Sequence, residues 1–146
     1  KLAIIKHAEG KFNDAIELYK ECVKLEKWLM ENVGTEKEQR DYFSTLLNLG
    51  TAYRVVKKTT DAQNVFEQCI SMVGKVDVPL DALATLYVNL AIVRNKNGNF
   101  SEAIEACEKG IQLAKELLQQ KNTKAEDILE ILLHVKNRSS KMERVE

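Results

Sequence analysis

Three cysteines and two histidines are the side chains of this chain best suited to nucleophilic or metal chemistry, and their spacing supports neither. Cys22, Cys69 and Cys107 form no Cys-x-x-Cys pair, the arrangement that zinc and redox sites use. His7 and His134 stand 127 residues apart and have no carboxylate or cysteine at ligand spacing. The sequence also lacks a Gly-rich phosphate loop, HExxH and GxSxG. We therefore predict no catalytic residue, no metal site and no cofactor, and expect the thiols to be packed as small hydrophobic side chains.

The composition describes a globular protein without a dominant charge. The 146 residues are 45% apolar and 30% charged, and 22 basic residues balance 22 acidic ones. No net field draws such a chain onto nucleic acid or an anionic membrane, and no apolar run is long enough to span one. Unpaired cysteines suit a reducing compartment. We expect an intracellular protein, cytoplasmic or else nuclear, that binds neither nucleic acid nor membrane, and a chain opening on Lys1 predicts a fragment.

Helices are expected almost everywhere, because proline and glycine occur where helices begin or end. Pro79 is the one proline, and Gly34 and Gly74 each follow a periodic apolar run. Capping boxes are predicted where Thr is followed by Glu or Gln three residues later, at 35–38, 60–63 and 123–126. The short connections predict antiparallel hairpins. The expected helices span about 1–9, 13–33, 36–57, 60–73, 79–97, 101–121 and 124–140.

An internal repeat organises these helices. The segment 10–17 reads GKFNDAIE and the segment 98–105 reads GNFSEAIE, with a diverged copy at 59–62. Aligning Ala15, Ala62 and Ala103 gives unequal spacings of 47 and 41 residues. Copied helical units that cannot bury their apolar faces alone stack on their neighbours. An α-solenoid is therefore the predicted architecture.

The middle copy carries the most specific motif. Leu46, Leu49-Gly50 and Tyr53, followed by Ala62, Phe66 and Cys69, resemble the first and second helices of a tetratricopeptide repeat. The resemblance covers residues 1 to about 121. Because the copies exceed the usual 34 residues, they are similar to the long repeats of kinesin light chains and Pins-like adaptors. Two features depart from the motif: Lys57-Lys58 stands where the other copies have a glycine-containing turn. At the position that Tyr53 occupies in the middle copy, the third copy has Arg94 and the first has Lys6.

The predicted fold class is all-α: one domain over 1–146 with three antiparallel hairpins and a C-terminal capping helix. The repeats are placed at about 1–34, 35–74 and 79–121, and the cap at 124–146. A truncated first helix of a further repeat is the alternative for the last segment. Trp28 is expected to pack in the core, with a role as a partner anchor as the alternative.

The resemblance implies a binding surface on the first helix of each hairpin, where stacked hairpins line a concave channel. The candidates are the side chains left when the packing positions are subtracted. In the middle copy they are Leu47, Asn48, Thr51, Arg54, Val55 and Lys58, and in the third they are Asn89, Ile92, Asn95 and Lys96.

Two matched asparagines are the most suggestive members of this set. Asn48 and Asn89 precede the Leu-Gly and Leu-Ala pairs, and an amide there could donate to and accept from an extended peptide backbone. The basic members favour an acidic segment or a terminal carboxylate. The alternative is that these candidates are ordinary solvated helix residues with no role in binding. Leu47 and Ile4 stand where the chaperone-binding carboxylate clamp of the family needs Lys and Asn, which disfavours a chaperone C-terminus as ligand.

These features predict a non-catalytic scaffold that binds an extended or helical peptide of a partner protein. Self-association or docking on another part of the parent chain is one alternative, and homo-oligomers would follow from it. A regulatory domain of an enzyme whose active site lies elsewhere is the other.

Overall fold

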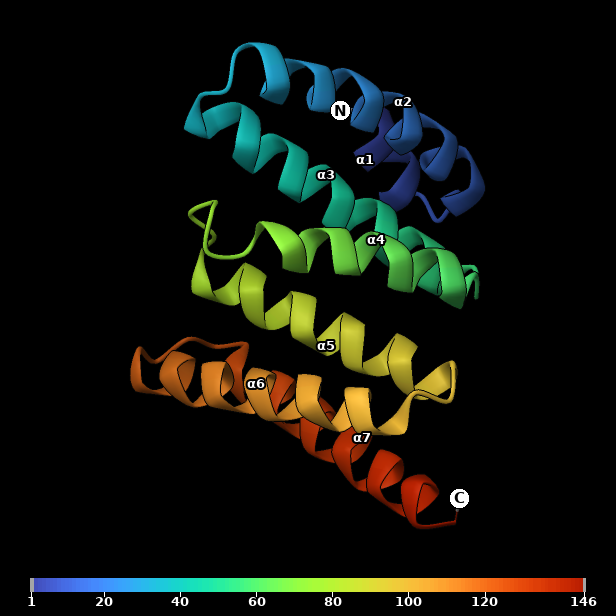
Figure 1. The fold of residues 1–146 in the computed structure, drawn as a ribbon, viewed down its shortest axis with the longest axis vertical. Coiled ribbons are helices and arrows are strands. Elements are labelled where there is room, and N and C mark those ends of the chain that lie inside the picture. Colours follow the sequence, from blue (N-terminus) through green and yellow to red (C-terminus); the bar gives the residue numbers. More distant parts are fainter. Residues whose placement is uncertain (1, 146) are drawn as a thin grey trace. The chain divides into compact units, whose positions relative to one another are not determined.

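The computed structural model describes residues 2–145, and this part of the chain is helical (Figure 1). An isolated bridge between Val73 and Val76 is the one β feature among these residues. The all-α fold class is confirmed. All predicted helix limits lie within about two residues of the observed ones, except that the last helix continues to Val145. The elements are α1 (Leu2–Ala8), α2 (Phe12–Asn32), α3 (Glu36–Val55), α4 (Thr59–Met72), α5 (Leu80–Lys96), α6 (Phe100–Gln119) and α7 (Ala125–Val145).

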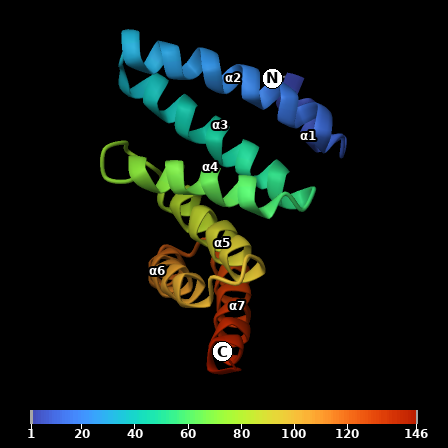
Figure 2. The same ribbon diagram turned by 45° about the vertical axis from the view of Figure 1, so that its right-hand side comes forward.

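The helices belong to two compact units, residues 1–77 and 78–146. In the first unit, the α1–α2 and α3–α4 hairpins are joined by the packing of α2 on α3 (Figure 1). In the second unit, α7 packs on α6 and also contacts α5 (Figure 2). Helical hairpins are thus the building blocks of both units, as the short connections predicted.

Three hairpin turns share one backbone conformation. Each has a residue with positive φ, followed by an N-cap residue with ψ near 68°; the positive φ values are 79° at Gly10, 66° at Lys57 and 81° at Gly98. The N-cap N–H donates to the carbonyl five residues earlier, at 2.9 Å to Lys6, 2.9 Å to Tyr53 and 2.8 Å to Arg94. The alignment of Ala15, Ala62 and Ala103 is therefore confirmed, and Lys57 occupies a position that suits glycine.

The predicted capping boxes are wrong. Thr35 is the N-cap of α3, but its hydroxyl contacts the Glu38 carboxylate and makes no cap bond to the backbone. Thr60 lies inside α4, whose N-cap is Lys58, and Thr123 precedes the start of α7 by two residues. The recurring turn explains the shift at α4, because its backbone fixes the N-cap directly after the positive-φ residue.

Close helix crossings at two glycines define the cores of the units. A Cβ at Gly50 would lie 2.5 Å from Cε1 of Phe66, so the absence of a side chain lets α3 approach α4. A Cβ at Gly110 would lie 2.8 Å from Leu132 and 3.3 Å from Tyr87, which brings α5, α6 and α7 together. Phe66 and Leu132 are fully buried. Each unit thus has its own tightly packed crossing.

Two predictions about buried residues need correction. Cys69 and Cys107 are fully buried as expected, but Cys22 is only half-buried. Trp28 is 57% exposed and is not a core residue. Trp28 lies in the second half of the 21-residue α2, and the seven residues of α1 lie beside only the first part of that helix.

Candidate functional site

The six predicted binding residues of the first unit lie on α3 and in the turn that follows it. Leu47, Asn48, Thr51 and Arg54 are half-buried, whereas Val55 and Lys58 are exposed. Their spacing of three and four residues places them along one side of the helix. The Thr51 hydroxyl donates to the carbonyl of Leu47 at 2.9 Å, so it is already engaged within the helix.

Arg54 differs from the other residues of this set in its polar environment. Its Nε is buried and has no hydrogen-bond partner within the described part of the chain. Burial also lowers the pKa of the guanidinium from its ordinary value. A desolvated donor without an acceptor is unfavourable, and this cost is part of the native structure.

The four predicted residues of the second unit lie on α5 and have different environments. Asn89 is 4% exposed, so its amide is closed to solvent, whereas its counterpart Asn48 is half-buried. Ile92 and Asn95 are half-buried and Lys96 is exposed. The matched asparagines therefore share a position in the repeat but not an environment.

Asn95 connects α5 to α7. The hydroxyl of Ser139, which is fully buried on α7, donates to Oδ1 of Asn95 at 2.9 Å. The sequence analysis did not single out Ser139, because serine is usually a surface residue. The available signal was the spacing of Leu132, Val135 and Ser139, since a serine at the next step of an apolar stripe still faces the core.

A basic hollow lies within the second unit, beside this hydrogen bond. We use "basic hollow" for the open depression of about 440 Å³ lined by Asn95, Lys96, Gly98, Phe100, Arg138, Lys141 and Met142. Lys96 comes from the end of α5, and Arg138 and Lys141 come from α7. Among residues 2–145, no ion pair involves any of these three cations.

An acidic rim adjoins the basic hollow at the start of α6. A smaller depression of about 200 Å³ is lined by residues 98–102 and Glu143. The hydroxyl of Ser101 contacts the carboxylate of Glu143 across this depression. The two depressions share Gly98 and Phe100, so basic and acidic groups lie next to each other on this surface.

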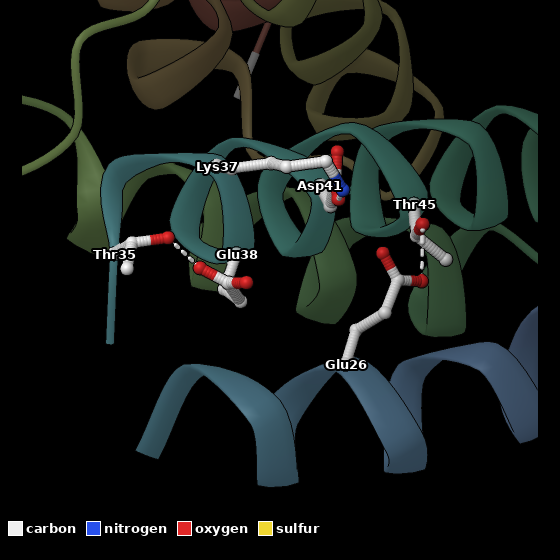
Figure 3. Close-up of polar contacts among 6 residues, drawn as sticks. All are labelled: Glu26, Thr35, Lys37, Glu38, Asp41 and Thr45. Atoms are coloured by element: carbon white, nitrogen blue, oxygen red, sulfur yellow. Dashed lines mark hydrogen bonds and ion pairs between the residues drawn. The ribbon is translucent and has the colours of Figure 1, made fainter. Parts of the chain in front are cut away.

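Polar side chains also meet where α2 packs on α3 in the first unit (Figure 3). The hydroxyl of Thr45 donates to Oε1 of Glu26 at 2.6 Å, and Nζ of Lys37 lies 2.9 Å from Asp41. Burial raises the pKa of Glu26. The space beside these residues is only about 50 Å³, and the described residues contain no cluster of His, Cys, Asp and Glu that could hold a metal ion. The hydrogen bond between Thr45 and Glu26 joins α3 to α2, whereas the ion pair between Lys37 and Asp41 lies within α3.

Across residues 2–145, no helix has the length and apolar character needed to cross a membrane.

Comparison with known proteins gives one family match. Residues 83–123 match the model of the tetratricopeptide repeat. No curated protein matches the sequence. Among solved structures, a crystal structure of MamA is similar at 19% identity and a TM-score of 0.43, over 99% of this chain and 95% of that one. A second MamA structure gives 18% identity and the same TM-score, over 97% of this chain and 88% of that one.

The family match covers most of the second unit's hairpin, because it begins within α5 and ends just after α6. It includes Tyr87, Leu90-Ala91 and Ala103, residues that carried the resemblance in the third copy. The match to the tetratricopeptide repeat model thus follows the α5–α6 hairpin.

Proposed function

We propose that this chain is a non-catalytic protein-interaction module that binds a peptide of a partner protein through the first helices of its hairpins. The observation that carries this proposal is the tetratricopeptide repeat at 83–123, a helical hairpin used for contact between proteins. The shared turn geometry supports extending the same role to the α3–α4 hairpin. The long repeats also support a relationship to kinesin light chains and Pins-like adaptors, and the free thiols favour the cytoplasm.

The α3 side of the first unit supplies suitable chemistry for such a peptide. Asn48 offers an amide that both donates and accepts, and Arg54 has a buried donor without an acceptor. Val55 is 40% exposed and adds an apolar contact. A peptide that presents a backbone amide beside an aliphatic side chain would contact Asn48 and Val55.

Selection from a displayed peptide library tests this proposal. Val55→Glu/Lys58→Glu changes two exposed residues of the α3 surface and should weaken selected peptides by about tenfold or more, as expected when central contacts are lost. Lys115→Glu/Lys124→Glu, on exposed positions outside the predicted set, is the matched control and should leave binding unchanged. Failure to select any peptide, or equal binding by all variants, would contradict the proposal.

A second candidate function is docking on another copy or on another part of the parent chain. Exposed apolar side chains on α1 and α2 favour it, with exposed fractions of 51–60% at Leu2, Ile4, Ile5, Leu25 and Trp28. Light scattering during size-exclusion chromatography, repeated over a range of concentrations, distinguishes it. A constant monomer mass, also unchanged by Trp28→Ser, would argue against self-association.

A further inference from the structure

We infer that the basic hollow of the second unit binds an acidic peptide segment that also carries an apolar side chain. This assignment rests on the proposed function and deepens it, because it names the chemistry of the partner. It also adds a surface formed by α7, which the candidate residues on α3 and α5 did not include.

Charge is the first argument. Lys96, Arg138 and Lys141 line one hollow and have no ion-pair partner among residues 2–145, although Lys136 on the same helix as the last two lies 3.9 Å from Glu108. The whole chain has 22 basic and 22 acidic residues, so the cluster is local and does not reflect a basic protein. Cations held near one another repel, and carboxylates from a ligand would relieve that repulsion.

The hollow is also held in shape by buried contacts. The hydrogen bond between Ser139 and Asn95 joins α7 to α5 next to the cations, and Leu132 packs against Gly110 further along α7. The cations therefore project from two helices whose relative position within this unit is set by the core. The helix backbones of this surface therefore need no rearrangement when it binds, and the ordering cost is confined to the exposed side chains.

The apolar residues that line the hollow predict which ligand side chains accompany the ligand's carboxylates. Phe100 is half-buried, Met142 is 47% exposed, and both line the hollow together with the three cations. A Leu, Ile or Phe of the ligand would contact these two side chains while neighbouring Asp or Glu residues meet the cations. About 440 Å³ is within the range of small binding sites and accommodates a few side chains.

Extended polyanions fit this surface less well than a short acidic peptide. Strong nucleic-acid binding uses about six to ten phosphate contacts, and lipid-binding clusters have about four to eight basic residues. Here three cations are bordered by Glu102 and Glu143. A long phosphate chain would meet these carboxylates, whereas a short peptide can end before them.

Fluorescence anisotropy with defined probes tests the inference. The probe is a labelled 12-residue peptide of alternating Glu and Leu, and the reference probe replaces each Glu with Gln. We expect the Glu probe to bind at least tenfold more tightly, and Arg138→Glu/Lys141→Glu to weaken it by about tenfold or more. Lys115→Glu/Lys124→Glu makes the same change of charge outside the hollow and should alter the affinity by less than about twofold. Arg138→Gln/Lys141→Gln should give an intermediate loss, and circular dichroism should show unchanged helix content.

Several outcomes would overturn the inference. If Lys115→Glu/Lys124→Glu lost as much affinity for the Glu probe as Arg138→Glu/Lys141→Glu, the effect would be one of net charge in general. If the Glu and Gln probes bound equally well, the ligand would not need to be acidic. Tighter binding of single-stranded RNA or of phosphatidylserine vesicles through Arg138 and Lys141 would assign the hollow to another class of ligand. If library-selected peptides bind the Arg138→Glu/Lys141→Glu variant normally but are lost with Val55→Glu/Lys58→Glu, the proposed function stands and this inference fails.

Discussion

Replacing Gly50 with alanine should destabilise the first unit, although the same change usually stabilises a helix. The added Cβ would lie 2.5, 2.8 and 2.9 Å from Cε1, Cδ1 and Cζ of Phe66, all well inside van der Waals contact. Phe66 is fully buried and so cannot turn toward solvent. Overpacking of this kind costs about 1–3 kcal/mol, and the intrinsic helix preference of alanine returns about 1 kcal/mol. Because three ring atoms lie inside contact distance, we expect the cost to exceed the gain, with a net loss of up to about 2 kcal/mol in the free energy of unfolding.

Urea denaturation followed by circular dichroism measures this loss, and a double-mutant cycle assigns it to the ring. Phe66→Leu removes the ring atoms that the new Cβ would meet, so Gly50→Ala should be nearly neutral or stabilising in that background. A coupling energy of about 1 kcal/mol or more between the two positions is expected for residues in direct contact. If Gly50→Ala stabilises the otherwise unchanged protein, the close crossing of α3 and α4 is wrong.

Three further predictions concern the turn, the thiols and the buried carboxylate. Lys57→Gly should stabilise the chain by about 0.5–1 kcal/mol, because φ is 66° there and a left-handed L-residue costs about 1–2 kcal/mol before the entropy of glycine is subtracted. The control is Lys58→Gly, at φ −86°, which should give no gain in stability in the same urea experiment. A water-soluble maleimide should label one thiol rapidly, at half-buried Cys22. The other two cysteines are fully buried, and burial raises the thiol pKa to about 12 at Cys69 and to about 11 at Cys107. Rapid addition of two labels, measured by mass spectrometry of the intact protein, would contradict this. The raised pKa of Glu26 means that its contribution to stability is present below the ordinary value of 4.5 and is lost as the pH rises through the folded-state pKa. Glu26→Gln should remove this loss, which stays below about 1 kcal/mol for a partly exposed group. Identical profiles of unfolding free energy against pH for the variant and the unchanged protein would refute this.

The periodic features of the fold were predictable from the sequence. Gly10, Lys57 and Gly98 occupy one turn conformation, and the alignment of three alanines located that turn even where lysine replaces glycine. The backbone conformation is specified by hydrogen bonds between main-chain groups, so it survives a substitution that costs about 1–2 kcal/mol. Repeated backbone geometry therefore leaves a strong signal at the level of spacing.

Burial of individual side chains was less predictable, because it depends on what covers each helix. Trp28 has the sequence pattern of a packed residue, yet it is 57% exposed on the second half of α2, and the seven residues of α1 lie beside only the first part of that helix. Ser139 has the appearance of a surface residue, yet it is fully buried between helices. The basic hollow was missed for the same reason, since Lys96 and Lys141 are distant in sequence and meet only because α7 packs on α5.

One position of the repeated turn shows how a common backbone carries different chemistry. The carbonyls of His7, Arg54 and Asn95 each accept from the positive-φ residue three positions later, at 3.0, 3.0 and 3.1 Å, so these residues are structurally equivalent. Their side chains nevertheless differ: His7 lies 3.3 Å from the Tyr19 hydroxyl, Nε of Arg54 has no partner, and Asn95 accepts from buried Ser139. Because the backbone is fixed, substitution here changes the polar contacts without changing the turn. We therefore place the chemical differences among the hairpins at this position, where the first helix ends, and expect partner choice to follow them.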